Sequence, residues 1–210
     1  MAELIRGLDA AVISANLERV REAAGKGVEI LAATKYVPIE EMEVLAEAGI
    51  ELVGENRQQD LAAKHERWGE LFQWDFIGNL QSRKVKLLVP VCRLIHSVDS
   101  DSALAQLGQH GGAATEVLVE VNVAEEEGKG GVAPARLGPF LAQCPVRVSG
   151  LMTMPPFSED PEHSRPHFAR LAELAGEHGL SRLSMGTSQD WRVAVQEGAT
   201  IIRLGHSLYA

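Results

Sequence analysis

Lys35 has a position in this sequence that suits covalent chemistry. It directly follows the apolar run at residues 30–34. A lysine in such a place keeps its stem against an apolar wall and presents its amine where the run ends. A nucleophilic amine is what Schiff-base formation with a carbonyl compound requires. The alternative is an ordinary surface lysine whose charged end reaches into water.

Two segments near the C-terminus have the composition of an anion-binding site. They are Ser184-Met185-Gly186-Thr187-Ser188 and Ile201-Ile202-Arg203-Leu204-Gly205-His206. Gly186 and Gly205 allow a ligand to approach the backbone closely, and amides at the start of a helix bind an anion without lysines. Ser188 adds a hydroxyl donor. It is also suited to capping the next helix, and the two roles are compatible.

Arg203 and Asn56 are two further polar residues that suggest a ligand. Arg203 interrupts the apolar run 201–204. An unpaired charge is costly there, so we expect beside it either a structural carboxylate or an acceptor on a bound ligand. Asn56, in Gly54-Glu55-Asn56-Arg57, is suited to contact a ligand ring or oxygen, or to cap the following helix. The residues alone leave these alternatives open.

The elements that position these residues are short apolar runs separated by helical patterns. The runs lie at 29–35, 51–55, 73–79, 93–99, 116–123, 148–154, 182–188 and 200–206. Near-continuous apolar runs of this length are typical of parallel strands that are covered on both faces. An amphipathic helix is predicted ahead of them at 9–25, because its apolar residues recur at helical spacing.

Eight strands that alternate with helices in a chain of 210 residues predict a compact (β/α)₈ TIM barrel. We expect one domain over residues 1–210, with the helix at 9–25 closing the ring where an eighth helix is missing. A doubly wound open sheet is the alternative. In a barrel, functional groups gather at the carboxyl ends of the strands, and the loops after strands seven and eight commonly bind phosphate.

Composition excludes several classes of partner. The chain is 45% hydrophobic and 23% charged, with a net charge of −9. It has no basic tract for a nucleic acid and no apolar run long enough for a membrane helix. Charges near the N-terminus, as at Glu3 and Arg6, argue against a secretory signal. Two distant cysteines, Cys92 and Cys144, give no disulfide framework, and a cytoplasmic location is expected.

Seven motifs occur in order along the chain, and together they are much more specific than any one of them. They are Ala33-Thr34-Lys35, Gly54-Glu55-Asn56-Arg57, Phe76-Ile77-Gly78-x-Leu80-Gln81-x-x-Lys84, Val121-Asn122-x-x-x-Glu126-x-x-Lys129-x-Gly131, Gly150-Leu151-Met152-x-Met154-Pro155-Pro156, Ser184-Met185-Gly186-x-Ser188-x-Asp190 and Ile202-Arg203-Leu204-Gly205. From about residue 28 onward the chain resembles the pyridoxal phosphate homeostasis proteins. These are single-domain relatives of the alanine racemase barrel.

The resemblance implies a barrel of fold type III that binds the vitamin B6 cofactor pyridoxal 5′-phosphate (PLP). It implies a lysine aldimine on Lys35, and a phosphate held by Ser188, with Gly186, and by the backbone near Gly205 and His206. Asn56, Met185 and Arg203 are expected around the ring. The implied role is the supply and buffering of PLP, and amino-acid and keto-acid balance, with no established turnover. PLP-dependent apoenzymes are the implied protein partners.

Three positions depart from the family pattern. Asp75 stands where the family often has His, Arg83 where it often has Asn, and Thr187 where Met is usual. We expect Asp75 and Arg83 near the mouth of the third strand, where they change the contacts of that wall. None of the three is expected to touch Lys35 or Arg203.

Three functions are compatible with these residues. They are a PLP carrier, a PLP-dependent amino-acid racemase, and a phosphate-binding barrel enzyme in which Lys35 reacts without PLP. A racemase of the alanine racemase type needs a second acid–base group facing the lysine, supplied there by a further domain and a dimer partner. This chain ends four residues after His206, so we favour a carrier, expect a monomer and keep the racemase as the alternative. An arginine at the ring nitrogen also weakens the ring as an electron sink.

Overall fold

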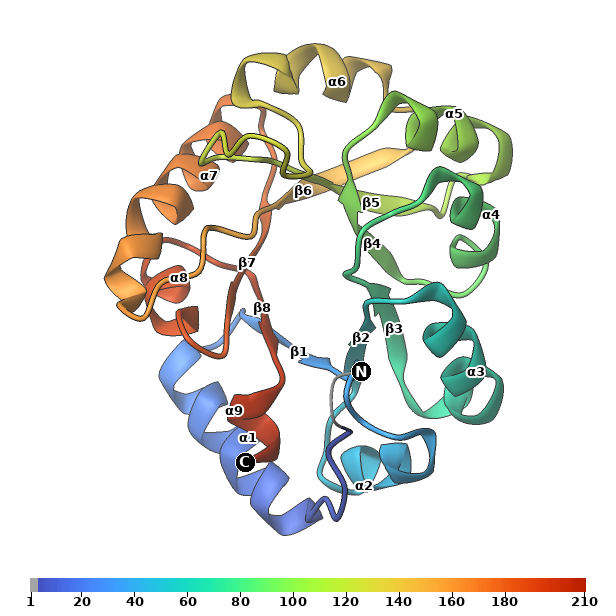
Figure 1. The fold of residues 1–210 in the computed structure, drawn as a ribbon, viewed down its shortest axis with the longest axis vertical. Coiled ribbons are helices and arrows are strands. Elements are labelled where there is room, and N and C mark those ends of the chain that lie inside the picture. The colour runs from blue at the N-terminus through green and yellow to red at the C-terminus, as the bar shows by residue number, and fades with distance from the viewer. Residues whose placement is uncertain (1–3) are drawn as a thin grey trace.

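Eight parallel strands close into a barrel in the computed structural model, which describes residues 4–210 (Figure 1). Each strand pairs with its neighbours in chain order, and β1 pairs with β8 to complete the ring. The strands are β1 (Glu29–Ala33), β2 (Leu52–Glu55), β3 (Gln73–Phe76), β4 (Leu94–Val98), β5 (Glu116–Glu120), β6 (Arg147–Met152), β7 (Arg182–Thr187) and β8 (Ile201–Leu204). The predicted barrel and its eight strands are confirmed, and the open sheet is excluded.

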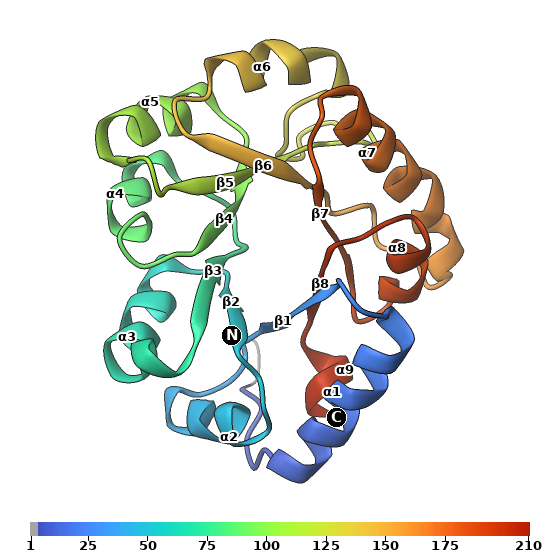
Figure 2. The ribbon, with the colours of Figure 1, turned by 180° about the vertical axis from the view of Figure 1, so that it is seen from behind.

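Helices surround the barrel on its outside, as both face-on views show (Figures 1 and 2). They are α1 (Ala10–Ala24), α2 (Met42–Glu47), α3 (Gln58–Trp68), α4 (Val85–Leu88), α5 (Asp101–His110), α6 (Leu137–Gln143), α7 (Arg165–Glu177), α8 (Trp191–Gln196) and α9 (His206–Tyr209). Short 3-10 turns lead into α2, α4, α6 and α7. None of the helices within residues 4–210 is long and apolar enough to cross a membrane.

The predicted N-terminal helix forms α1 and completes the helical ring. The Asp9 carboxylate accepts hydrogen bonds from the first amides of α1, and Gly25 ends the helix at φ +82°. The amide of Asn16 donates to the carbonyls of Leu208 (3.0 Å) and Ala210 (2.9 Å), which ties α1 to the single-turn helix α9. The predicted role of this helix in closing the ring is therefore confirmed.

The side chains of the strands form two layers, one inside the barrel and one outside it, because successive side chains of a strand point to opposite faces. The inner apolar cluster contains Leu31, Leu52, Leu94, Leu118, Met152 and Ile201, with Ile77 packed against it. The residues between them belong to the larger cluster under the helices. Asp75, His96, Ser184 and Arg203 are buried polar residues at inward positions.

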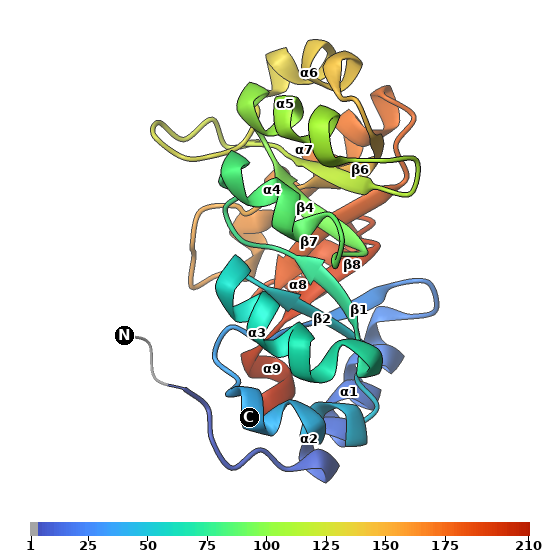
Figure 3. The same cartoon turned by 90° about the vertical axis from the view of Figure 1, so that its right-hand side faces the viewer.

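The two ends of the barrel differ in character. At the amino ends of the strands, Glu29 pairs with Arg93 (2.6 Å) and with Arg182. Arg182 also pairs with Glu116 (3.1 Å), so ion pairs link several strands there. At the carboxyl ends, the connections after β5 and β6 extend from the molecule on the same side (Figure 3).

Candidate functional site

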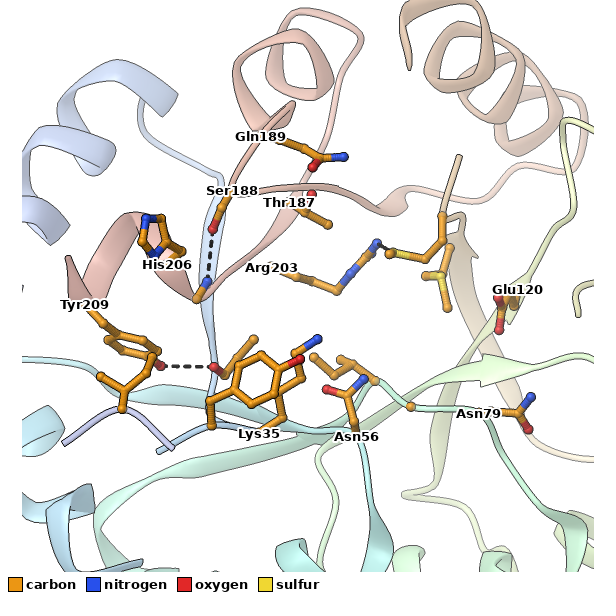
Figure 4. A pocket seen from close by; sticks show the side chains of 18 of the residues that line it. Lys35, Asn56, Asn79, Glu120, Thr187, Ser188, Gln189, Arg203, His206 and Tyr209 are labelled. Atoms are coloured by element: carbon orange, nitrogen blue, oxygen red, sulfur yellow. Dashed lines mark hydrogen bonds between the residues drawn. The ribbon is translucent and has the colours of Figure 1, made fainter. Parts of the chain in front are cut away.

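A cavity of about 800 Å³ opens at the carboxyl ends of the strands. Six of the eight residues predicted to bind a cofactor line it (Figure 4), and these are Lys35, Asn56, Ser188, Arg203, Gly205 and His206. They lie on or directly after β1, β2, β7 and β8, the first and last strands of the chain, so the pairing of β1 with β8 is what brings them together.

Lys35 reaches the cavity by strand alternation. Leu31 points into the barrel, Ala33 lines the cavity, and Lys35 is the next residue on the same face. Its Nζ lies 4.7 Å from the centre of the Tyr36 ring, and it has no hydrogen bond or ion pair with another residue of the described part of the chain. Lys35 is exposed, as expected for the alternative of an ordinary surface lysine. Its amine nevertheless lines the cavity and is free to react with a ligand there.

Asn56 contributes a buried oxygen that lacks a partner. Its Oδ1 has no hydrogen bond to any described residue. The helix that follows, α3, has Arg57 as its N-cap, and no side chain caps it. Asn56 is therefore not a helix cap. An orphaned buried acceptor is costly, and a ligand with an N–H or O–H group facing Asn56 removes that cost.

Ser188 lies against the start of α9 and not at the start of α8. Its Oγ accepts hydrogen bonds from the amides of Gly205 (3.3 Å) and Ser207 (3.2 Å). The N-cap of α8 is Asp190, so the helix-cap alternative for Ser188 is wrong. Because both amides donate to this oxygen, the hydroxyl hydrogen of Ser188 is the donor available at this end of the cavity, which suits an anionic group.

Arg203 is held inside the barrel by neutral acceptors. One Nη donates to Ser184 Oγ (2.6 Å), and the other donates to the Thr153 carbonyl (2.9 Å) and to Met154 Sδ (2.8 Å). None of these acceptors is a carboxylate, so the structural carboxylate that the sequence left open is not found in residues 4–210. Burial lowers the pKa of Arg203 to about 10, although the charges of Glu120 and Asp190 oppose this. The arginine stays cationic at neutral pH and faces the cavity.

Met185 and Gly186 do not line the cavity. Ser184 points inward, so Met185, the next residue of β7, points outward, and its buried side chain packs in the core under the helices. Gly186 has φ +90°, and a Cβ there would lie 2.6 Å from Ala194 Cβ and 2.9 Å from Trp191 Cα. Close packing of α8 against β7 thus explains this glycine.

Sequence reasoning missed several residues of the cavity wall, above all Glu120. This residue ends β5, and β5 lies across the ring from β1. Burial raises the pKa of Glu120 to about 7, and the charge of Asp99 adds to this, while Arg203 and Lys129 lower it. The cavity is also lined by Tyr36, Asn79, Met154 and Tyr209. An acidic residue inside the predicted apolar run 116–123 was the available signal for Glu120.

The departures from the family pattern lie in three different places. Asp75 lies inside the barrel and not at its mouth, because β3 turns this residue inward, where it accepts hydrogen bonds from Arg93. Arg83 contacts Gln81 in the turn before α4. Thr187 lines the cavity and donates to Asp190 (3.1 Å). The expectation that placed Asp75 near the mouth of the third strand was wrong.

Comparison with known proteins agrees with this geometry. The family model of the alanine racemase N-terminal domain matches residues 8–210. The pyridoxal phosphate homeostasis protein of Aquifex aeolicus is 41% identical over 217 residues, which cover 94% of this chain and 95% of the relative. The chain belongs to the pyridoxal phosphate homeostasis protein family. The family member of Pseudomonas aeruginosa is 34% identical, over 95% of this chain and 92% of its own.

Solved structures of this family and of racemases share the barrel. PipY of Synechococcus elongatus, solved with PLP bound, is 32% identical, with a TM-score of 0.83 over 94% of this chain and 100% of its own. Alanine racemase of Corynebacterium glutamicum is 16% identical, with a TM-score of 0.74 over 96% of this chain and 61% of its own. The similarity to alanine racemase shows a shared fold and nothing more.

Proposed function

We propose that this family member binds PLP in the cavity at the barrel mouth and takes part in intracellular PLP homeostasis. One observation carries the proposal. The free amine of Lys35, the unpartnered Oδ1 of Asn56 and the partly unsatisfied guanidinium of Arg203 line the same cavity. The PLP-bound relative PipY supports the choice of cofactor.

The residues present fit the functional groups of PLP. When bound, PLP supplies an aldehyde to which the Lys35 amine adds, with loss of water, to form a carbon–nitrogen double bond. The donors around Ser188, Gly205 and His206 would hold the phosphate. Arg203 would donate to the ring nitrogen and Asn56 would accept from a donor on the ring side. Met185 and Gly186 would act indirectly, by fixing β7 against α8.

The surroundings of Arg203 favour a holder of PLP over a catalyst. A guanidinium donates to a ring nitrogen and cannot accept its proton. The nitrogen then stays unprotonated, and the ring is a poor electron sink. A cofactor held in this way is chemically quiet and can be passed on intact. We therefore propose that a monomer supplies PLP to apoenzymes and so contributes to amino-acid and keto-acid balance.

The experiment is borohydride reduction of the PLP-loaded protein, followed by peptide mass spectrometry. The adduct should lie on Lys35, and Lys35→Ala should abolish it without lowering the melting temperature. Lys84→Ala is the matched control, because Lys84 donates to Gln58 (3.0 Å) and does not line the cavity. An adduct that persists at Lys84 or Lys129 in Lys35→Ala would refute the assignment of the amine. A wild type without any reducible adduct would favour an enzyme that does not use PLP.

Amino-acid racemisation remains a second candidate, and Glu120 is the observation that favours it. The sequence predicted no acid–base group facing Lys35, yet Glu120 lines the same cavity from the opposite strand. A carboxyl with its pKa near 7 can both donate and accept a proton at neutral pH. Exchange of the α-proton of alanine in D₂O is the measurement that decides. Exchange that depends on both Lys35 and Glu120 supports the racemase, whereas the carrier predicts none.

A further inference from the structure

A chain of hydrogen bonds runs through the barrel interior beneath the cavity. Arg203 Nη donates to Ser184 Oγ (2.6 Å), Ser184 Oγ contacts His96 Nδ1 (2.8 Å), and His96 Nε2 contacts Asp75 Oδ2 (3.0 Å). The four residues come from β8, β7, β4 and β3. Asp75, His96 and Ser184 are fully buried, so water does not compete for these contacts.

The donor and the acceptor of each hydrogen bond in this series can be assigned. Arg93 donates to both oxygens of Asp75 (2.9 and 2.6 Å), so the carboxylate is ionised and only accepts. Burial tends to raise the pKa of Asp75, but these hydrogen bonds, with that from His96, hold it below its usual value. Burial lowers the pKa of His96, and the charges of Arg203 and Arg93 add to this, so the imidazole is neutral although Asp75 opposes the shift.

A neutral imidazole has one N–H and one acceptor nitrogen. Because Asp75 only accepts, the hydrogen of His96 must be on Nε2, and Nδ1 must be an acceptor. The Ser184 hydroxyl therefore donates to Nδ1. Its oxygen lone pairs are then left to accept from Arg203, which has donors only.

We propose that Asp75, His96 and Ser184 form a positioning relay that orients the Arg203 guanidinium toward the ligand in the cavity. The proposal rests on the proposed function, in which that ligand is PLP and Arg203 faces its ring nitrogen. Of the five N–H donors of an arginine, three are engaged by Ser184, Thr153 and Met154. The relay fixes the first of these acceptors, and the remaining donors are available to the ligand.

The Asp75→Leu variant keeps the branching of the side chain and removes the acceptor of His96 Nε2, while Arg93 keeps its partner Glu29. A buried N–H without an acceptor is costly. The imidazole hydrogen therefore moves to Nδ1, which donates to Ser184. The hydroxyl hydrogen of Ser184 loses its acceptor and is turned toward the donors of Arg203, so the guanidinium is displaced.

Two measurements on the purified protein test the relay. In the ligand-free protein, ¹⁵N NMR of the imidazole nitrogens should show the Nε2–H form of His96, and Asp75→Leu should convert it to the Nδ1–H form. In PLP titrations followed by visible absorbance, Asp75→Leu and Ser184→Ala should each weaken binding about tenfold, as expected for a lost hydrogen bond to a charged group. Glu116→Gln is the control and should bind normally, because Glu116 pairs with Arg182 and Arg147 and does not contact the relay.

A coupling experiment distinguishes positioning from a loss of stability. Arg203→Met leaves no buried carboxylate without a partner, because Arg203 has no carboxylate partner. It provides the background for Asp75→Leu and Ser184→Ala. If the relay acts through Arg203, neither substitution weakens PLP binding further in that background. An equal loss with and without Arg203, or an unchanged tautomer in Asp75→Leu, overturns the relay.

Failure of the proposed function gives a different result. If the wild type does not bind PLP, the test uses the ligand-free protein alone. NMR of the guanidinium N–H groups of Arg203 then measures whether the guanidinium rotates freely. Restricted rotation in the wild type that becomes averaged in Ser184→Ala supports the relay. Signals that are the same in both proteins refute it.

Discussion

Lys35 and Arg203 are two cations at the cavity with opposite surroundings. Lys35 is exposed and has no hydrogen-bond or ion-pair partner within residues 4–210, whereas Arg203 is buried and bonded to neutral acceptors. A mobile amine can form and break a covalent bond with a ligand, and a fixed guanidinium can orient it. Glu120 is the carboxyl of the same cavity whose charge depends on pH near neutrality.

Glu120→Gln should change how stability depends on pH. Burial, and then the charge of Asp99, raises the pKa of Glu120 from 4.5 to about 7 in the folded state. The protonated carboxyl favours folding, so its contribution is complete below pH 4.5 and is lost as the pH rises to about 7. Thermal melts between these values should show the wild type losing stability relative to Glu120→Gln. Parallel curves for the two proteins would contradict the raised pKa.

Whether a strand residue points into the barrel or out of it explains which site residues could be predicted. Lys35 and Arg203 were found because a charged residue beside an apolar run is conspicuous in the sequence. Met185 was misplaced because a run that is apolar on both faces does not show which residues point inward. Once Ser184 is known to point inward, Met185 must point outward. Asp75 was misplaced for the same reason, since the pattern of β3 does not reveal its inward direction.

At the scale of elements, the two glycines of the predicted phosphate site have different roles. A Cβ at Gly205 would lie 3.6 Å from the Ala33 carbonyl, an ordinary contact. A Cβ at Gly186 would meet Trp191 Cα at 2.9 Å, on backbone with φ +90°. The first glycine borders the cavity, and the second allows α8 to pack against β7.

Gly186→Ala should therefore destabilise the fold by about 1–3 kcal/mol, as overpacking commonly does. Gly205→Ala should melt like the wild type but bind PLP several-fold more weakly, because the added methyl group crowds the amides at the start of α9. Thermal melts and PLP titrations of the two variants provide the comparison. A stable Gly186→Ala protein, or a Gly205→Ala protein with normal affinity, would contradict this division of roles.

The existence and order of the elements could be predicted, but their ends could not. The predicted first run extends to Lys35, whereas β1 ends at Ala33, because the ladder stops while the chain continues along the cavity wall. Asn56 and Ser188 resemble helix caps in sequence. The neighbours that exclude this role for Ser188 are Gly205 and Ser207, which come from a distant segment of the chain.

At the scale of the whole molecule, ion pairs that link several strands lie at the amino ends of the barrel, and the cavity lies at the carboxyl ends. Glu29 joins Arg93 and Arg182 at the amino ends of the strands. Residues at that end of such barrels generally serve stability, and residues at the carboxyl ends serve function. The number of apolar runs predicted the closed ring, whereas the ion pairs depend on register and could not be predicted from the sequence.

Glu29→Gln should lower the free energy of unfolding by roughly 1–2 kcal/mol, between the values for exposed and buried ion pairs. PLP binding should change less than twofold, because Glu29 does not line the cavity. Chemical denaturation and PLP titration of the same preparation measure both quantities. A large loss of affinity without a loss of stability would show that the two ends of the barrel are not independent.

The contact between Gly186 and Trp191 has an optical consequence. Trp191 is buried and backs β7 just before the chain reaches Ser188 at the cavity. Indole emits in the near ultraviolet, where a conjugated pyridine ring absorbs, so a ring that enters the cavity should quench this tryptophan by energy transfer. Trp191→Phe should remove most of the quenching, whereas Trp68→Phe should retain it. The intrinsic fluorescence of the unlabelled chain would then report, in real time, how much of the protein carries its ligand.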